Sequence, residues 1–229
     1  MARLSQEHLE RLAAAYDLGV DQGSTTAVKG WAREQASRVH REFAKLTRKI
    51  DVHFTERDPY QSFAELLADV EANKRMFVYT GGSDTPLWDE KTNWMARAVH
   101  DWDHVEGKFD FSVEGEIGAY KYSAARAPGL AKLYLSEIAL QAASSALIGF
   151  VPGATQKVVV PPDDIVRLAD TFSTNGKKRR GATPKLVATE ALALRLARFM
   201  SPSDMAVHLG AARTGKTNAI VATVGTELV

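Results

Sequence analysis

Residues 130–148 restrict the fold more than any other stretch, because apolar side chains recur around nearly the whole circumference of the helix that they predict. The apolar residues of this stretch are Leu130, Leu133, Tyr134, Ile138, Leu140, Ala142 and Leu147. Such a helix has no polar face for water and packs in the middle of a bundle. The chain must therefore supply other helices to cover it, and the carboxyl group of Glu137 within it needs a partner.

Capping residues and apolar residues at helical spacing predict these covering helices. Ser5, Ser112 and either Asp163 or Asp164 are the expected N-caps. Helices are expected over 6–17, from Ser24 or Thr25 to Lys49, and over 63–70, 90–105, 113–127, 130–148, 163–172 and 185–200. Strands are expected over 50–54 and 75–79, while 158–160 fit an edge strand or an extended arm.

The chain has 229 residues, of which 45% are hydrophobic, so it is long enough to bury a substantial core. No internal repeat or long linker divides it. We predict a mainly α fold, with a helical, bundle-like single domain over residues 1–200 that contains a few short strands. A loosely held C-terminal tail is expected over 201–229.

Two histidines in the expected helix 90–105 indicate a metal site. His100 and His104 are one helical turn apart, so both imidazoles project from the same face and can share a metal ion. Glu116 is the first candidate for a carboxylate ligand, because it lies early in the next helix, where negative charge is favoured. The sequence predicts a metal site near residues 97–141 with these three ligands.

The absence of cysteine leaves histidine and acidic side chains as the available metal ligands. Two histidines and a carboxylate suit zinc in hydrolysis or ferrous iron in oxygen chemistry. In a hydrolase, the metal lowers the pKa of bound water to about 7, and Asp101 or Glu137 is placed to take the proton of that water. Asn93 and Arg97, in the two turns before the histidines, and Gln141 are candidate substrate-binding residues.

The residues around this predicted site form a longer pattern. Its members are Asn93, Arg97-Ala98-Val99-His100-Asp101, His104, Gly107, Phe111, Gly115-Glu116, Ser136-Glu137-Ile138 and Gln141. The pattern resembles an uncharacterised family found in bacteriophages and mobile elements, which has an R-x-V-H-D…H…F…G-E core. The resemblance implies a phage or prophage origin more than a reaction.

Two other interpretations of the histidines stay open. A hydrogen-bonded network of histidine and acidic side chains could simply stabilise a helical core. Alternatively, a metal-dependent phosphohydrolase of the HD type would bring His53 close to Asp101. The residues available for that pattern are His53, His100-Asp101 and one of Asp163, Asp164 or Asp170.

A P-loop expression is matched by residues 210–217, Gly-Ala-Ala-Arg-Thr-Gly-Lys-Thr. A phosphate-binding P-loop needs a strand before it and a helix after it. Only twelve residues follow the match, and Ala219 to Val224 fit strand or coil, so we interpret it as a coincidence.

The charge pattern bears on possible partners. The net charge of +1 gives no general attraction to nucleic acid or to an anionic membrane. The basic run of Lys177, Lys178, Arg179 and Arg180 could contact nucleic acid. This run supports the alternative of a structural or DNA-associated phage protein, whereas the metal site predicts a small-molecule or nucleotide-like substrate.

The N-terminal residues lack the apolar segment of a secretory signal, and no run approaches the roughly 20 apolar residues that span a bilayer. We therefore expect the protein in the cytoplasm of a host cell, or associated with a virion, and without a membrane partner. The sequence leaves the oligomeric state open.

Overall fold

The computed structural model describes residues 4–81, 85–149 and 156–172. The predicted helix 185–200, the basic run 177–180, the P-loop match 210–217 and the tail 201–229 lie outside the described residues. Within the described part, helices dominate and one sheet contains two strands, which confirms the mainly α fold class. Among the same residues, no helix is both long and apolar enough to cross a lipid bilayer.

The elements follow the expected order along the chain. They are α1 (Gln6–Asp17), α2 (Thr26–Leu46), β1 (Asp51–Thr55), α3 (Phe63–Asn73), β2 (Arg75–Tyr79), α4 (Glu90–Gly107), α5 (Val113–Arg126), η1 (Pro128–Leu130), α6 (Ala131–Tyr134), η2 (Leu135–Leu140), α7 (Gln141–Ile148) and α8 (Asp163–Asp170). Ser5, Thr25 and Ser112 are N-caps whose side chains accept hydrogen bonds from the first turns of α1, α2 and α5, as their positions predict.

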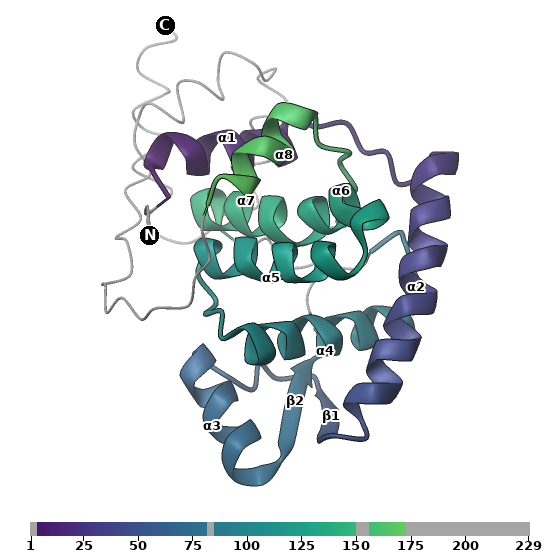
Figure 1. Cartoon of the computed structure of the whole chain (residues 1–229), viewed down its shortest axis with the longest axis vertical. Helices are drawn as coiled ribbons and strands as arrows, with labels where there is room; N and C mark the ends of the chain where they lie inside the picture. The colour runs from purple at the N-terminus through teal and green to yellow at the C-terminus, as the bar shows by residue number, and fades with distance from the viewer. Residues whose placement is uncertain (1–3, 82–84, 150–155, 173–229) are drawn as a thin grey trace, which may run out of the picture.

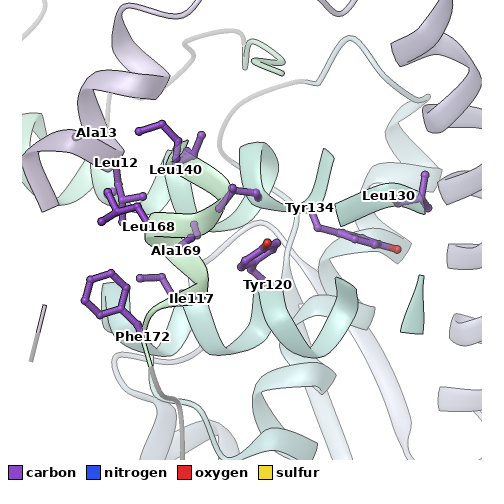
Figure 2. Packing of buried hydrophobic residues seen from close by; sticks show 14 residues of the cluster. Leu12, Ala13, Ile117, Tyr120, Leu130, Tyr134, Leu140, Leu168, Ala169 and Phe172 are labelled. Atoms are coloured by element: carbon purple, nitrogen blue, oxygen red, sulfur yellow. The ribbon is translucent and has the colours of Figure 1, made fainter. Parts of the chain in front are cut away.

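A continuous helical stretch from η1 to α7 forms the centre of the larger core (Figure 1). Leu135 and Leu140 within it are fully buried, and Ile117 of α5 packs in the same cluster. Leu12 of α1 and Leu168 of α8 belong to the same cluster, and Figure 2 shows them beside Leu140 and Ile117. The prediction that residues 130–148 form a buried central helix is therefore confirmed.

The second core lies below α4, between that helix, the sheet and α3 (Figure 1). β1 and β2 pair in parallel, with Asp51 opposite Arg75, and α3 forms the crossover between them. Met76 and Val78 of β2 are buried against Ala98 of α4. Helix α4 thus packs its apolar face on this small core and turns its polar face toward α5.

Several element boundaries differ from the prediction. α2 ends at Leu46 instead of Lys49, because the chain turns there to enter β1. α8 ends at Asp170, and its N-cap is Pro162, so neither Asp163 nor Asp164 caps it. The central helix contains a π-helical segment, η2, that the sequence pattern did not predict.

Residues 158–160 form an extended arm and belong to no strand. The backbone N–H groups of the arm donate to side chains: Val158 to Asp21, Val159 to Ser136 and Val160 to Gln22. Because side-chain oxygens satisfy these donors, the arm needs no neighbouring strand. Of the two alternatives that the sequence left open, the arm is the one observed.

Candidate functional site

His100 and His104 lie on the face of α4 that is turned toward α5. Asp89 caps α4 by accepting a hydrogen bond from the backbone N–H of Thr92, which fixes where the helix begins. One helical turn separates the two imidazoles, and their Nε2 atoms are 3.2 Å apart. The side chain of His104 is fully buried, whereas that of His100 is 28% exposed. One histidine therefore forms the floor of the site and the other reaches its surface.

Glu116 completes the group from the first turn of α5. Its Oε2 atom is 3.2 Å from Nε2 of His100 and 3.4 Å from Nε2 of His104. Ligand atoms bound at about 2.0–2.1 Å in a tetrahedron lie about 3.3–3.4 Å from one another. The three observed separations match one face of such a tetrahedron, so these atoms could hold a zinc-sized cation and leave the fourth position open.

The ring of His104 is fixed by the loop between α4 and α5. Its Nδ1 atom lies 3.1 Å from the carbonyl oxygen of Phe109, an acceptor only, so Nδ1 carries the proton and donates it. Nε2 is then the ring atom that faces Glu116. A backbone carbonyl on the far nitrogen is a common support for a metal-binding histidine, because it sets both the tautomer and the orientation of the ring.

Glycines allow this loop to pack closely on the two helices. A Cβ atom at Gly115 would overlap the carbonyl oxygen of Asp110, and one at Gly107 or Gly118 would overlap the ring of Phe109. Gly115 therefore makes room for the loop backbone, and Gly107 and Gly118 make room for the ring of Phe109. Two of them, Gly107 and Gly115, belong to the pattern identified in the sequence.

Charge is strongly coupled between His100 and Glu116. Burial lowers the pKa of His100, but the adjacent Glu116 carboxylate outweighs burial and raises that pKa to about 9. Burial likewise raises the pKa of Glu116, and the two histidines outweigh it and lower that pKa to about 2. The Nδ1 atom of His100 is buried without a hydrogen-bond partner. Without a cation, the pair is a protonated imidazole beside a carboxylate.

A cleft of about 530 Å³ opens above this group, between α2, α4, α5 and the π-helical segment η2. A volume of this size is typical of small-molecule sites. The residues predicted for the site that line the cleft are Asn93, Arg97, His100, Asp101, Glu116, Glu137 and Gln141. His104 lies beneath them, against His100 and Glu116. The structure thus brings all the predicted site residues together, although their chemical roles stay predictions.

Arg97 connects the end of β2 to the cleft. Its Nη1 atom donates to the carbonyl oxygens of Tyr79, at 3.2 Å, and Gly81. Burial raises the pKa of the neighbouring Asp101 to about 6, against the opposing effect of the two histidines. Both side chains therefore stand at the same wall of the cleft as His100.

Glu137 reaches the cleft from the opposite wall, where η2 interrupts the regular α-helix. A π-helical turn inserts an extra residue into the helix, and such turns often occur at functional sites. Burial, together with the negative charge of Asp21, raises the pKa of Glu137 to about 8. At neutral pH this carboxyl group is protonated, a form that donates a proton.

A second polar group at the cleft was missed by sequence reasoning. Asp103 of α4 is buried and accepts two hydrogen bonds from Nη2 of Arg126, at 2.6 and 2.7 Å, and one from Ser123 Oγ at 2.5 Å. Arg38 of α2 donates to the carbonyl oxygen of Arg126 at 2.6 Å. Asp103 stood beside the histidines in the sequence, but no local pattern linked it to partners on two other helices.

His53 does not approach Asp101. It lies exposed on β1, stacked on Phe77 with the ring centroids 5.0 Å apart, and it is absent from the cleft lining. The arrangement that the HD interpretation requires is therefore not formed among the described residues. No protein-family model, curated protein or solved structure matches the chain.

Proposed function

We propose that this protein is a metal-dependent hydrolase whose cation is held by His100, His104 and Glu116. The observation that carries the proposal is the triangle of their ligand atoms, with edges of 3.2 to 3.4 Å at the base of a cleft. The spacing and the imidazole-rich donor set suit zinc, and ferrous iron is the alternative, since two histidines and a carboxylate also bind that ion. Such a cation supplies a bound water with a pKa near 7.

Side chains around the cleft supply the remaining parts of a hydrolytic reaction. The attacking water forms a bond to the substrate as the bond to the leaving group breaks. Asp101, next to His100, takes the proton of the water, and the protonated Glu137 on the opposite wall gives a proton to the leaving group. Asn93, Arg97 and Gln141 orient the substrate.

We also propose a phage or prophage origin, which the R-x-V-H-D…H…F…G-E pattern supports. A separate observation supports an alternative to catalysis. The ion pair between His100 and Glu116 supports a structural protein in which the cluster only ties α4 to α5, because the pair is complete without a cation. The hydrolase should contain a bound metal ion after purification, whereas the structural protein should contain none.

Metal content and hydrolysis, measured together, test the proposal. Purified protein should contain one zinc or iron per chain and cleave p-nitrophenyl acetate or bis(p-nitrophenyl) phosphate. His100→Ala should lose the metal and at least 100-fold of the activity, whereas His53→Ala, on the exposed face of β1, should retain both. A wild-type protein without metal, or His100→Ala activity equal to wild type, would contradict the proposal and favour the structural alternative.

A further inference from the structure

Three guanidinium groups gather in the cleft, and the proposed hydrolase uses only that of Arg97. Arg38, Arg97 and Arg126 come from α2, α4 and α5, and all three line the same cleft as His100. Arginine is the side chain best suited to phosphate, since its planar fork can donate two parallel hydrogen bonds.

Arg126 is held in place by one of its three nitrogens. Nη2 alone makes both bonds to Asp103, and the guanidinium plane lies over the ring of Tyr122, 4.2 Å from its centroid. Nε and Nη1 are buried and have no hydrogen-bond partner. Buried donors without partners are rare in folded proteins and commonly mark the place of an absent water, ion or ligand.

Gln35 adds an unpartnered acceptor to the same cleft. Its residue is 5% exposed, and its Oε1 atom is buried without a hydrogen-bond partner. The aromatic rings of Tyr79, Trp88 and Tyr134 also line the cleft, and the indole N–H of Trp88 is fixed on the carbonyl oxygen of Ala32 at 3.0 Å. The wall therefore offers donors for an oxyanion, a polar group for a hydroxyl or amino group, and flat apolar surfaces for a ring.

Charge in the cleft makes anion binding depend on the cation. Three arginines face the carboxylates of Glu42, Asp101, Asp103 and Glu116, whereas Glu137 is protonated at neutral pH. Without a metal the protonated His100 brings the positive charges level with these four carboxylates. A divalent cation beside His100 makes the cleft positive overall, because it adds two charges and displaces at most one proton from the imidazole.

We infer that the substrate carries a phosphate group, held between the cation and the arginines Arg38 and Arg126, with a ring on the aromatic wall, as in a nucleoside monophosphate. This inference rests on the proposed metal site. Asp103 acts through Arg126 and is a positioning residue, because its carboxylate fixes the orientation of the guanidinium.

Calorimetric titration of zinc-loaded full-length protein, freed of excess zinc, tests the inference with inorganic phosphate, adenosine and adenosine 5′-monophosphate as probes. The monophosphate should bind at least tenfold more tightly than adenosine, and zinc-free protein should not bind phosphate. Arg38→Gln and Arg126→Lys should each weaken phosphate and monophosphate binding at least tenfold. Arg33→Gln, an exposed position on the same helix as Arg38, should bind like wild type.

The outcomes separate the two proposals. If wild-type protein holds no zinc or iron, both the metal site and the phosphate inference are overturned. If zinc is bound at one per chain but adenosine binds as tightly as its monophosphate, or Arg38→Gln and Arg126→Lys bind phosphate like wild type, only the phosphate inference fails. Circular dichroism of each variant shows whether it is folded. If Arg38→Gln is poorly folded, Arg126→Lys still tests the inference, because lysine keeps a positive charge beside Asp103.

Discussion

At the residue scale, the chemistry of this protein depends on side chains whose surroundings set their protonation. His104 donates through Nδ1 to the carbonyl oxygen of Phe109 and so turns its Nε2 atom toward Glu116. Glu137 is the reverse case, because burial keeps a proton on a group that is normally ionised at neutral pH. The site therefore offers a fixed Nε2 atom to a cation at its base and a protonated carboxyl group on the opposite wall.

Glu137 should make the stability of the metal-free protein depend on pH. Its pKa is raised from 4.5 to about 8 on folding, so between these values the folded protein holds a proton that the unfolded chain has lost. The free energy of unfolding then falls as the pH rises through this window. In Glu137→Gln this fall should be smaller by roughly 1 to 3 kcal/mol, because no carboxyl group remains to titrate.

Urea denaturation of EDTA-treated protein at pH 5 and pH 8 measures the difference. Glu71→Gln, an exposed glutamate of α3, is the matched control and should lose as much stability as wild type between these values. An equal loss in Glu137→Gln and wild type would show that Glu137 is ionised in the folded protein.

Gly115 should be intolerant of a side chain. A Cβ atom there would overlap the carbonyl oxygen of Asp110, so Gly115→Ala must displace the loop that carries Phe109. We expect a loss of about 1–3 kcal/mol in the free energy of unfolding, measured by chemical denaturation. Gly30→Ala is the control, since its Cβ meets open space in the middle of α2, and it should stabilise the protein by about 1 kcal/mol. Equal effects of the two substitutions would refute the close approach.

At the scale of elements, polar side chains join α4 to α5 at several places, and two of these joints border the cleft. His100 and His104 meet Glu116 near the start of α5, and Asp103 meets Arg126 at its last residue. The second joint is a buried ion pair, in which the loss of either charge leaves the other unpaired. Its main function in our account is therefore to orient Arg126, and its net effect on stability is small.

Substitutions of Asp103 and Arg126 distinguish a role in phosphate binding from a role in the stability of the fold. Arg126→Met leaves Asp103 buried without its partner and should cost about 3 kcal/mol of unfolding free energy. The double variant Arg126→Met/Asp103→Leu should recover most of that loss, yet still bind phosphate at least tenfold more weakly than wild type. Thermal unfolding and phosphate titration test the two halves. A double variant as unstable as Arg126→Met would show that the pair is a stabilising strut.

The predictability of the elements follows from how local their causes are. Ser5 and Ser112 cap helices through bonds to residues three positions ahead, and the sequence predicts such caps well. His100 and His104 share a helix face for the same local reason. The π-helical turn of η2, by contrast, and the bond from Asp103 to Arg126 depend on how whole helices pack, so no local pattern predicts them.

At the scale of the whole molecule, the cleft lies between two cores. In the larger core, α1, α5 and α8 pack around the helical stretch from η1 to α7, and the sheet and α3 build the smaller core below α4 (Figure 1). The ligands come from α4 and α5, so a cation that binds them joins elements of both. Because the unfolded chain cannot assemble such a site, cation binding should favour the folded state.

The most direct measurement of the central claim is anomalous diffraction from crystals grown with zinc. We predict one strong peak within about 2.0–2.2 Å of Nε2 of His100, Nε2 of His104 and Oε2 of Glu116. The fourth coordination position of that ion should face the cleft. Crystals of Glu116→Gln should show a weak peak or none there. A wild-type crystal with no peak between these three atoms, at a zinc concentration that fills other sites, would contradict the account.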